Sequence, residues 1–137
     1  MSASSRVRGL RPSPLHGSMR AMGEIYHMIR AETWVAVQGE AEYRDDSLAH
    51  EGFIHCTAGE RNLVDVAARH YAGDRGDWLV LVLDPAKLRS EVRWELQPDA
   101  LAYPHIYGPL NLDAVTAVCR FPRNPEGVFQ PFRDLVV

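Results

Sequence analysis

The feature that most constrains the fold of this chain is a run of six apolar residues, Trp-Leu-Val-Leu-Val-Leu, at residues 78–83. Gly76 precedes the run and Asp84-Pro85 follows it, and residues of these types end regular structure. A run that is short and apolar at every position is typical of a strand covered on both faces. We therefore expect residues 78–83 to form a strand at the centre of a sheet.

Shorter segments of the same kind predict the other strands, with residues 25–29 apolar on both faces like an interior strand. The four segments are 25–29, 52–57, 92–96 and 115–121. Helix-forming residues predict a short helix over 31–38 and a second helix that begins at Thr57 and ends near Gly73. Loops are expected over residues 40–51 and 98–109. Because strands and helices do not alternate regularly, the predicted fold is α+β, with a mixed, mostly antiparallel sheet and about two flanking helices.

Length and composition limit the kinds of protein that the chain can be. Its 137 residues fit one domain, which we place at residues 24–137, after a Ser-, Arg-, Gly- and Pro-rich stretch at residues 1–23 interpreted as a disordered leader. The formal charge of -3, with scattered basic residues, argues against binding to a nucleic-acid backbone. Cys56 and Cys119 lie in apolar runs and are expected as reduced thiols. With no membrane helix or secretory signal in the sequence, we expect a cytoplasmic protein.

Histidines on the predicted strands are the main candidates for a functional site. Alternation places His27 on the same face as Ile25 and Ile29, and it places His55 on the same face as Phe53 and Thr57. Each ring therefore has apolar neighbours, and either one alone is as consistent with a core histidine as with a ligand. Together with His105, which lies in an aromatic segment bounded by Gly and Pro, they favour a shared small-molecule pocket. In contrast, we expect His70 to pack on its helix stripe, and His16 and His50 to face solvent.

Four further residues complete the candidate site. Glu95 is a candidate catalytic carboxylate together with His105, although an ordinary exposed strand carboxylate fits equally well. Thr57 and Glu60 have the spacing of a capping box, and the helix start at 57–60 is a candidate anion site as well. Tyr107 is a candidate stacking residue, and Gly108 is a candidate ligand contact where Gly108-Pro109 turns the chain.

Five segments occur in one order that resembles the bacterial family called domain of unknown function 952. The resemblance covers about residues 24–121, and its segments are Ile25-Tyr26-His27, Gly52-Phe53-Ile54-His55-Cys56-Thr57, Leu81-Val82-Leu83-Asp84-Pro85-Ala86-Lys87-Leu88, Arg93-Trp94-Glu95 and Pro104-His105-Ile106-Tyr107-Gly108-Pro109-Leu110. The resemblance implies a fold similar to the ADP-ribosyltransferase superfamily, whose members split NAD or a related ribosyl linkage. The family itself has no established activity.

The resemblance also implies roles for individual residues. In NAD-dependent members of that superfamily, a first-strand His or Arg holds the adenosine ribose, and a late-strand Glu fixes the nicotinamide ribose. His27 matches the first position, and Glu95 is the candidate for the second. The ligand so implied is nucleotide-like, such as NAD or ADP-ribose, bound without a metal or a separate cofactor.

Two other interpretations remain open at this stage. The first is a non-catalytic binding module built on the same scaffold. The second is a metal site formed by His27, His55, His105 and Glu95, since imidazole and carboxylate groups suit Zn, Mn or Fe. No two of these residues have the close spacing of known short zinc motifs. The sequence leaves the oligomeric state open.

Overall fold

The structure is a computed structural model, and it describes residues 23–137; the predicted leader lies almost entirely outside the described residues. The regular elements occur in the order β1 (Ile25–Arg30), α2 (Ala31–Val37), β2 (Glu42–Tyr43), α3 (Asp46–Glu51), β3 (Ile54–His55), α4 (Glu60–His70), β4 (Trp78–Leu83), η2 (Pro85–Lys87), β5 (Glu91–Leu96), β6 (Ala102–Tyr107), β7 (Leu110–Asn111), η3 (Leu112–Ala114) and β8 (Val115–Phe121).

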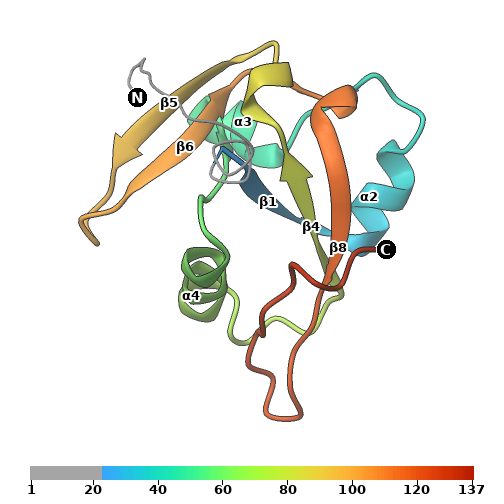
Figure 1. The fold of residues 1–137 in the computed structure, drawn as a ribbon, viewed down its shortest axis with the longest axis vertical. Helices are drawn as coiled ribbons and strands as arrows, with labels where there is room; N and C mark the ends of the chain where they lie inside the picture. The colour runs from blue at the N-terminus through green and yellow to red at the C-terminus, as the bar shows by residue number, and fades with distance from the viewer. Residues whose placement is uncertain (1–22) are drawn as a thin grey trace.

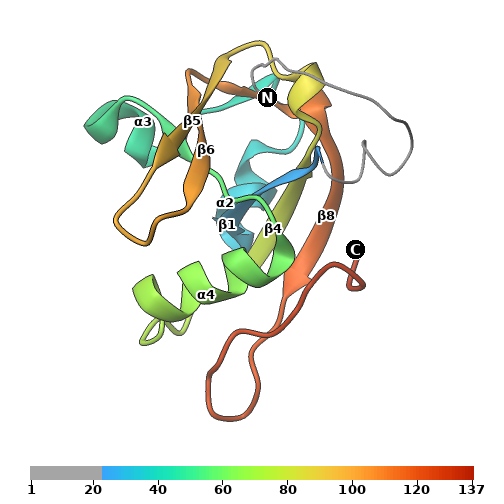
Figure 2. The ribbon, with the colours of Figure 1, turned by 60° about the vertical axis from the view of Figure 1, so that its left-hand side comes forward.

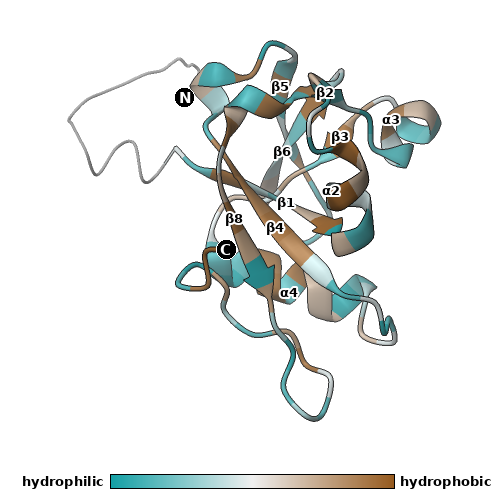
Figure 3. Ribbon diagram, turned by 90° about the vertical axis from the view of Figure 1, so that its right-hand side faces the viewer, coloured by the Kyte–Doolittle hydropathy of each residue, from teal (hydrophilic) through white to brown (hydrophobic). Residues whose placement is uncertain are grey.

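Three antiparallel sheets form the framework, which confirms the α+β prediction (Figure 1). The first sheet has the strand order β1-β4-β8, the second pairs β2 with β7, and the third has the order β3-β6-β5. Strand β4 is central, as predicted, and is coloured as apolar over most of its length in Figure 3. The prediction of residues 25–29 as an interior strand is wrong, because β1 lies at the edge of its sheet. On its outer side, β1 forms an isolated bridge between Tyr26 and Thr57.

The alternation of side chains along β4 divides the core into two parts. Val80 and Val82 face helix α4 and pack with its Leu63 and Ala67. The opposite face of β4 packs with residues of the other two sheets, including Ile54 and Ile106. Figure 2 shows α4 below the turn of the β5–β6 hairpin. Polar side chains join the two, since Arg69 of α4 contacts Asp99 and Tyr103.

Two predicted loops are in fact regular structure. Residues 40–51 contain β2 and α3, and α3 begins at Asp45, whose side chain accepts a hydrogen bond from Ser47 N (2.9 Å). The polar composition of α3 concealed it because the helix has no buried residue. Strand β6 occupies half of the second expected loop, although it contains Pro104. Pro104 has no N–H to donate, but its carbonyl still accepts a hydrogen bond from Cys56 N (3.2 Å).

Two of the predicted boundaries are also wrong. The strand expected over residues 52–57 is only Ile54–His55, and helix α4 ends at His70, with Tyr71 as its C-cap, before reaching Gly73. The chain after β8 returns along the sheet and adds Phe129 and Phe132 to the core. The sequence pattern gave no sign of this last contribution, since residues 122–137 have neither strand nor helix periodicity.

Candidate functional site

The polar side chains border a cavity of about 740 Å³, a volume in the range typical of small-molecule sites. Its walls are β1, β3 with the segment after it, the helices α3 and α4, and β6 with the turn that precedes it. The lining residues are Tyr26, His27, Met28, Asp45, Ser47, Glu51, His55, Cys56, Thr57, Leu63, Val66, Arg69, His70, Tyr71, Trp78, Gln97, Pro98, Asp99, Tyr103 and His105. The structure therefore brings together His27, His55, Thr57 and His105, which come from separate segments of the sequence.

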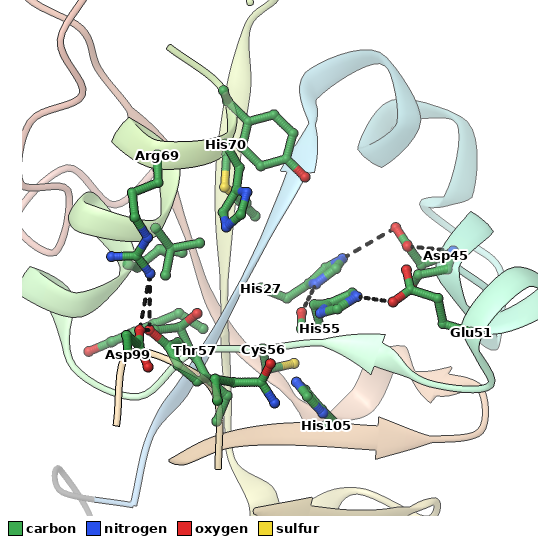
Figure 4. Close-up of a pocket in the computed structure, with 18 of the residues that line it drawn as sticks. His27, Asp45, Glu51, His55, Cys56, Thr57, Arg69, His70, Asp99 and His105 are labelled. Carbon is green, nitrogen blue, oxygen red and sulfur yellow. Dashed lines mark hydrogen bonds and ion pairs between the residues drawn. The ribbon is translucent and has the colours of Figure 1, made fainter. Parts of the chain in front are cut away.

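His27 is one of two deeply buried histidines in the lining and, like His105, is 4% exposed. Its Nδ1 donates a hydrogen bond to the backbone carbonyl of His55 (2.7 Å), which leaves Nε2 as the lone-pair nitrogen of the neutral ring. This Nε2 is buried and has no hydrogen-bond partner among the described residues. It faces Asp45 Oδ1 at 3.7 Å, which is too long for a hydrogen bond (Figure 4).

Burial lowers the pKa of His27, and the nearby Asp45 carboxylate and the His55 carbonyl only partly offset that effect. Burial alone raises the pKa of Asp45. Its interaction with His27 and the hydrogen bonds from Tyr43 and Ser47 outweigh this effect, so the pKa lies below its usual value. Near neutral pH the pair is therefore a neutral imidazole beside an ionised carboxylate. Two hydrogen-bond acceptors then face each other inside the cavity wall.

The lowered pKa of His27 predicts how stability depends on pH. Because the folded-state pKa lies below the ordinary value of 6.5, the unfolded chain binds the proton first, and stability falls as pH decreases from about 6.5. We expect His27→Gln to reduce this loss between about pH 7 and pH 5, measured by urea unfolding. His50→Gln, on the exposed end of α3, is the matched control and should retain it. Equal losses in His27→Gln and the native chain would contradict this assignment.

His55 lies at the mouth of the same region, and its side chain is 53% exposed. Its Nε2 lies 3.1 Å from Oε1 of Glu51, the last residue of α3. Its ring contacts those of Phe53 (centroids 4.8 Å apart) and His105 (5.2 Å). The predicted common face of Phe53 and His55 is therefore confirmed. His55 thus contributes its ring to the cavity and its backbone carbonyl to the support of His27.

His105 belongs to strand β6 and is buried, where a loop position was expected. Its ring stacks on Phe53, with centroids 4.2 Å apart and planes at 15°. Its Nδ1 lies 2.7 Å from Glu95 Oε1, which also accepts a hydrogen bond from the Tyr107 hydroxyl (2.6 Å). The hydrogen bonds from Tyr107 and His105 hold the pKa of Glu95 below its usual value. Glu95 does not line the cavity, whereas His105 does, so the carboxylate supports the ring from behind.

Tyr107 likewise does not line the cavity, although its ring, like that of His105, contacts Phe53 (centroids 5.2 Å apart). Its ring packs under the Arg93 guanidinium, 4.1 Å from the ring centroid, and its hydroxyl is committed to Glu95. The predicted stacking role of Tyr107 toward a ligand does not fit this position. Arg93 in turn pairs with Glu91 (3.0 Å).

Thr57 lines the cavity but does not cap helix α4, so the predicted capping box is wrong. The N-cap residue is Gly59, and Thr57 pairs with Tyr26 through two backbone hydrogen bonds of 2.8 Å. Glu60 extends instead to the C-terminal segment and accepts hydrogen bonds from the backbone of Phe132 and Arg133. This carboxylate in the first turn also disfavours the anion site predicted at the helix start.

Gly108 has a structural position and does not line the cavity. Its φ is +151°, and an added Cβ would lie 2.4 Å from Ser90 Oγ, which donates a hydrogen bond to Pro109 O. We expect Gly108→Ala to destabilise the fold by about 2–4 kcal/mol through strain and overpacking, measured by urea unfolding. Gly39→Ala is the control, because Gly39 also has a positive φ but open space around it. Equal losses in the two variants would rule out the contact with Ser90.

Several lining residues were missed by sequence reasoning. His70 is exposed at the end of α4 and borders the cavity, so its predicted packing role is wrong. At the same end, Arg69 contacts Asp99 (3.2 Å) and the Tyr103 hydroxyl (3.3 Å). These contacts join α4 to the β5–β6 turn. Only for Asp45 did the sequence hold a signal, because Asp is one of the residues preferred at a helix N-cap.

The cysteines and metal-ligand types have well-defined positions. Cys56 and Cys119 are both buried free thiols, as predicted. Burial raises the pKa of Cys56, so this lining thiol stays protonated and is a poor nucleophile.

Among residues 23–137, no three His, Cys, Asp or Glu side chains are arranged to hold a metal ion. Of the candidate metal ligands His27, His55, His105 and Glu95, the two histidines His27 and His105 already have a hydrogen bond at Nδ1.

Comparison with known proteins identifies the family. Residues 28–118, more than half of the chain, match the family described as "Protein of unknown function (DUF952)". The chain belongs to this family. The DUF952 match includes His55, Glu95 and His105, and it begins one residue after His27. No curated protein matches the chain.

Solved structures of the protein CC0527 of Caulobacter crescentus have a similar fold. Its crystal structure aligns with a TM-score of 0.68 and 24% identity, over 78% of this chain and 93% of that chain. Its solution NMR structure gives a TM-score of 0.66 and 24% identity, over 80% of this chain and 93% of that chain. This likeness shows the DUF952 chain's fold alone. Within the described part of the chain, no helix combines the length and apolar character required to span a bilayer.

Proposed function

We propose that the cavity binds a small ribosyl ligand, a nucleotide or a related riboside such as NAD or ADP-ribose. The observation that carries this proposal is the convergence of His27, His55 and His105 on one cavity from strands β1, β3 and β6. The rings of His27 and His105 are fixed by hydrogen bonds at Nδ1, so each presents Nε2 as a directed polar group. Such a small number of placed polar groups in a mostly apolar cavity is typical of small-molecule sites.

The finer proposal is an ADP-ribosyltransferase-like scaffold. Its support is the resemblance of the ordered sequence segments, together with a first-strand histidine, His27, in the cavity wall. Under this proposal His27 contacts ribose hydroxyls, and the aromatic residues Tyr71 and Tyr103 are available along the wall to contact a ring.

If the ligand is turned over, His105 is the group placed to move a proton. Glu95 holds His105 Nδ1, so Nε2 remains free to accept a proton, and the carboxylate stabilises the imidazolium that forms. For NAD, the bond between ribose C1′ and the nicotinamide nitrogen breaks and a water oxygen bonds to C1′. His105 takes the proton released by that water, and nicotinamide leaves with the electron pair of the broken bond. Glu95 is thus a positioning residue in this scheme.

One observation favours a binding module without turnover. Glu95 lies outside the cavity lining, so no carboxylate at this position is available to face a developing positive charge on the ribose. The carboxylates that do line the cavity belong to Asp45, Glu51 and Asp99. A binding module would use the same histidines and release no product.

The test is calorimetric titration and thermal shift of the full chain with nicotinamide riboside, NAD, ADP-ribose and nucleotides, followed by chromatography for released nicotinamide. Binding with release supports an enzyme, and binding without release supports the module. His27→Gln should weaken binding about tenfold or more, as expected when a buried polar contact is lost, whereas His50→Gln should not. Absence of binding to every ligand would reject both forms of the proposal.

A further inference from the structure

The charges that line the cavity are predominantly negative. Three carboxylates border it, from Asp45, Glu51 and Asp99, against a single guanidinium, that of Arg69. Within residues 23–137, Arg69 is the sole Lys or Arg in this lining, and its Nη2 already contacts Asp99 and Tyr103. No cation in the wall is therefore left uncommitted for a phosphate group.

The negative charge is concentrated at one end. Figure 4 shows Asp45 and Glu51 beside His27 and His55, with Arg69 and Asp99 at the opposite end. Arg69 and Asp99 largely offset each other because they form an ion pair (3.2 Å). A ligand at the His27 end therefore meets two carboxylates that no Arg or Lys of the lining neutralises.

A second, independent observation at this end is the unpartnered Nε2 of His27, which belongs to a side chain that is only 5% exposed. It faces Asp45 Oδ1 across 3.7 Å, and both atoms are acceptors. Asp45 Oδ1 already accepts a hydrogen bond from the Tyr43 hydroxyl (2.5 Å), so the acceptor without a partner is His27 Nε2. A ligand group that donates a hydrogen bond or carries positive charge suits both this nitrogen and the neighbouring carboxylate. The Asp45 side chain is 28% exposed, so this group can approach beside the carboxylate.

We infer that the cavity selects a riboside that carries no phosphate, and that a cationic base or amide group of this riboside occupies the His27–Asp45–Glu51 end. This inference rests on the proposed function and names the ligand class for the same site. A phosphate in the cavity would lie near several carboxylates in a partly desolvated space, where like charges repel more strongly than in water. A pyridinium riboside has the opposite charge and an amide donor.

The test compares nicotinamide riboside, nicotinamide mononucleotide and NAD, which share base and ribose but differ in phosphate. We expect calorimetry at low ionic strength to give about tenfold or tighter binding for the riboside than for the mononucleotide. Added salt should narrow this ratio because it screens the repulsion. Tighter binding of the mononucleotide or of NAD would overturn the inference and leave the proposed function standing. Absence of binding by all three and by ADP-ribose would overturn both.

Charge-neutralising variants identify the residues responsible. Glu51→Gln and Asp45→Asn should each reduce the preference for the riboside by several-fold, and Asn retains the ability to cap α3. Glu126→Gln removes the same charge from an exposed position outside the lining and should leave the ratio unchanged. An unchanged ratio in both Glu51→Gln and Asp45→Asn, with the fold intact by circular dichroism, would exclude this end of the cavity as the source of selectivity.

Discussion

A His105→Gln variant is expected to lose turnover of a cleaved ribosyl ligand by about 10²–10⁴-fold, the range for removal of a general acid–base group. The physical reason is that glutamine keeps a polar side chain near Glu95 but has no nitrogen able to take a proton near neutral pH. Binding should change much less than turnover, since the cavity and His27 are preserved. Single-turnover chromatography together with calorimetry separates the two effects.

The control for this variant is Tyr107→Phe, which removes the other hydrogen bond to Glu95 without touching the cavity. Since that hydrogen bond is the leading cause of the lowered pKa of Glu95, its loss should raise the pKa toward the usual value. The acid limb of the pH–rate profile should then shift to higher pH, with little change in the maximal rate. Turnover of His105→Gln within about threefold of the native chain would exclude proton transfer by His105.

Phe132→Ala is expected to lower the free energy of unfolding by about 3–5 kcal/mol, the usual cost of removing a buried aromatic ring. Phe132 is 0% exposed, and its ring contacts those of Tyr26 (centroids 5.1 Å apart) and Phe121 (5.2 Å). It secures the C-terminal segment against β1 and β8. Urea unfolding followed by circular dichroism measures the change.

The matched control is Val128→Ala, on the same segment but 49% exposed, which should change stability by no more than about 0.5 kcal/mol. The Phe132 result also bears on the site. Glu60, at the start of α4, accepts hydrogen bonds from the backbone of Phe132 and Arg133, so loosening this segment should loosen the cavity wall. A loss below about 1 kcal/mol for Phe132→Ala would contradict this account of the C-terminal segment.

Local apolar pattern was enough to locate most of the framework. β4 and β8 have the predicted bounds, and β1 and α2 differ from the prediction by one residue each. β1 and β4 are readable because each buries most of its own side chains, so their apolar composition reports the burial. Strand β6 was not readable because Pro104 and the flanking polar residues indicate a loop. Pairing of β6 with both β3 and β5 outweighs that local preference.

For the site, the sequence by itself placed His27 and His55 on strands and indicated the face that each presents. That was enough to nominate His27 and His55, since strand alternation is a local property. Only the tertiary structure decided that Glu95 lies behind His105 and outside the cavity, and that Asp45 faces His27. The reason is that these positions depend on how α3, α4 and the β5–β6 hairpin pack across β1. The charge of the cavity follows from this long-range packing, which no local pattern encodes.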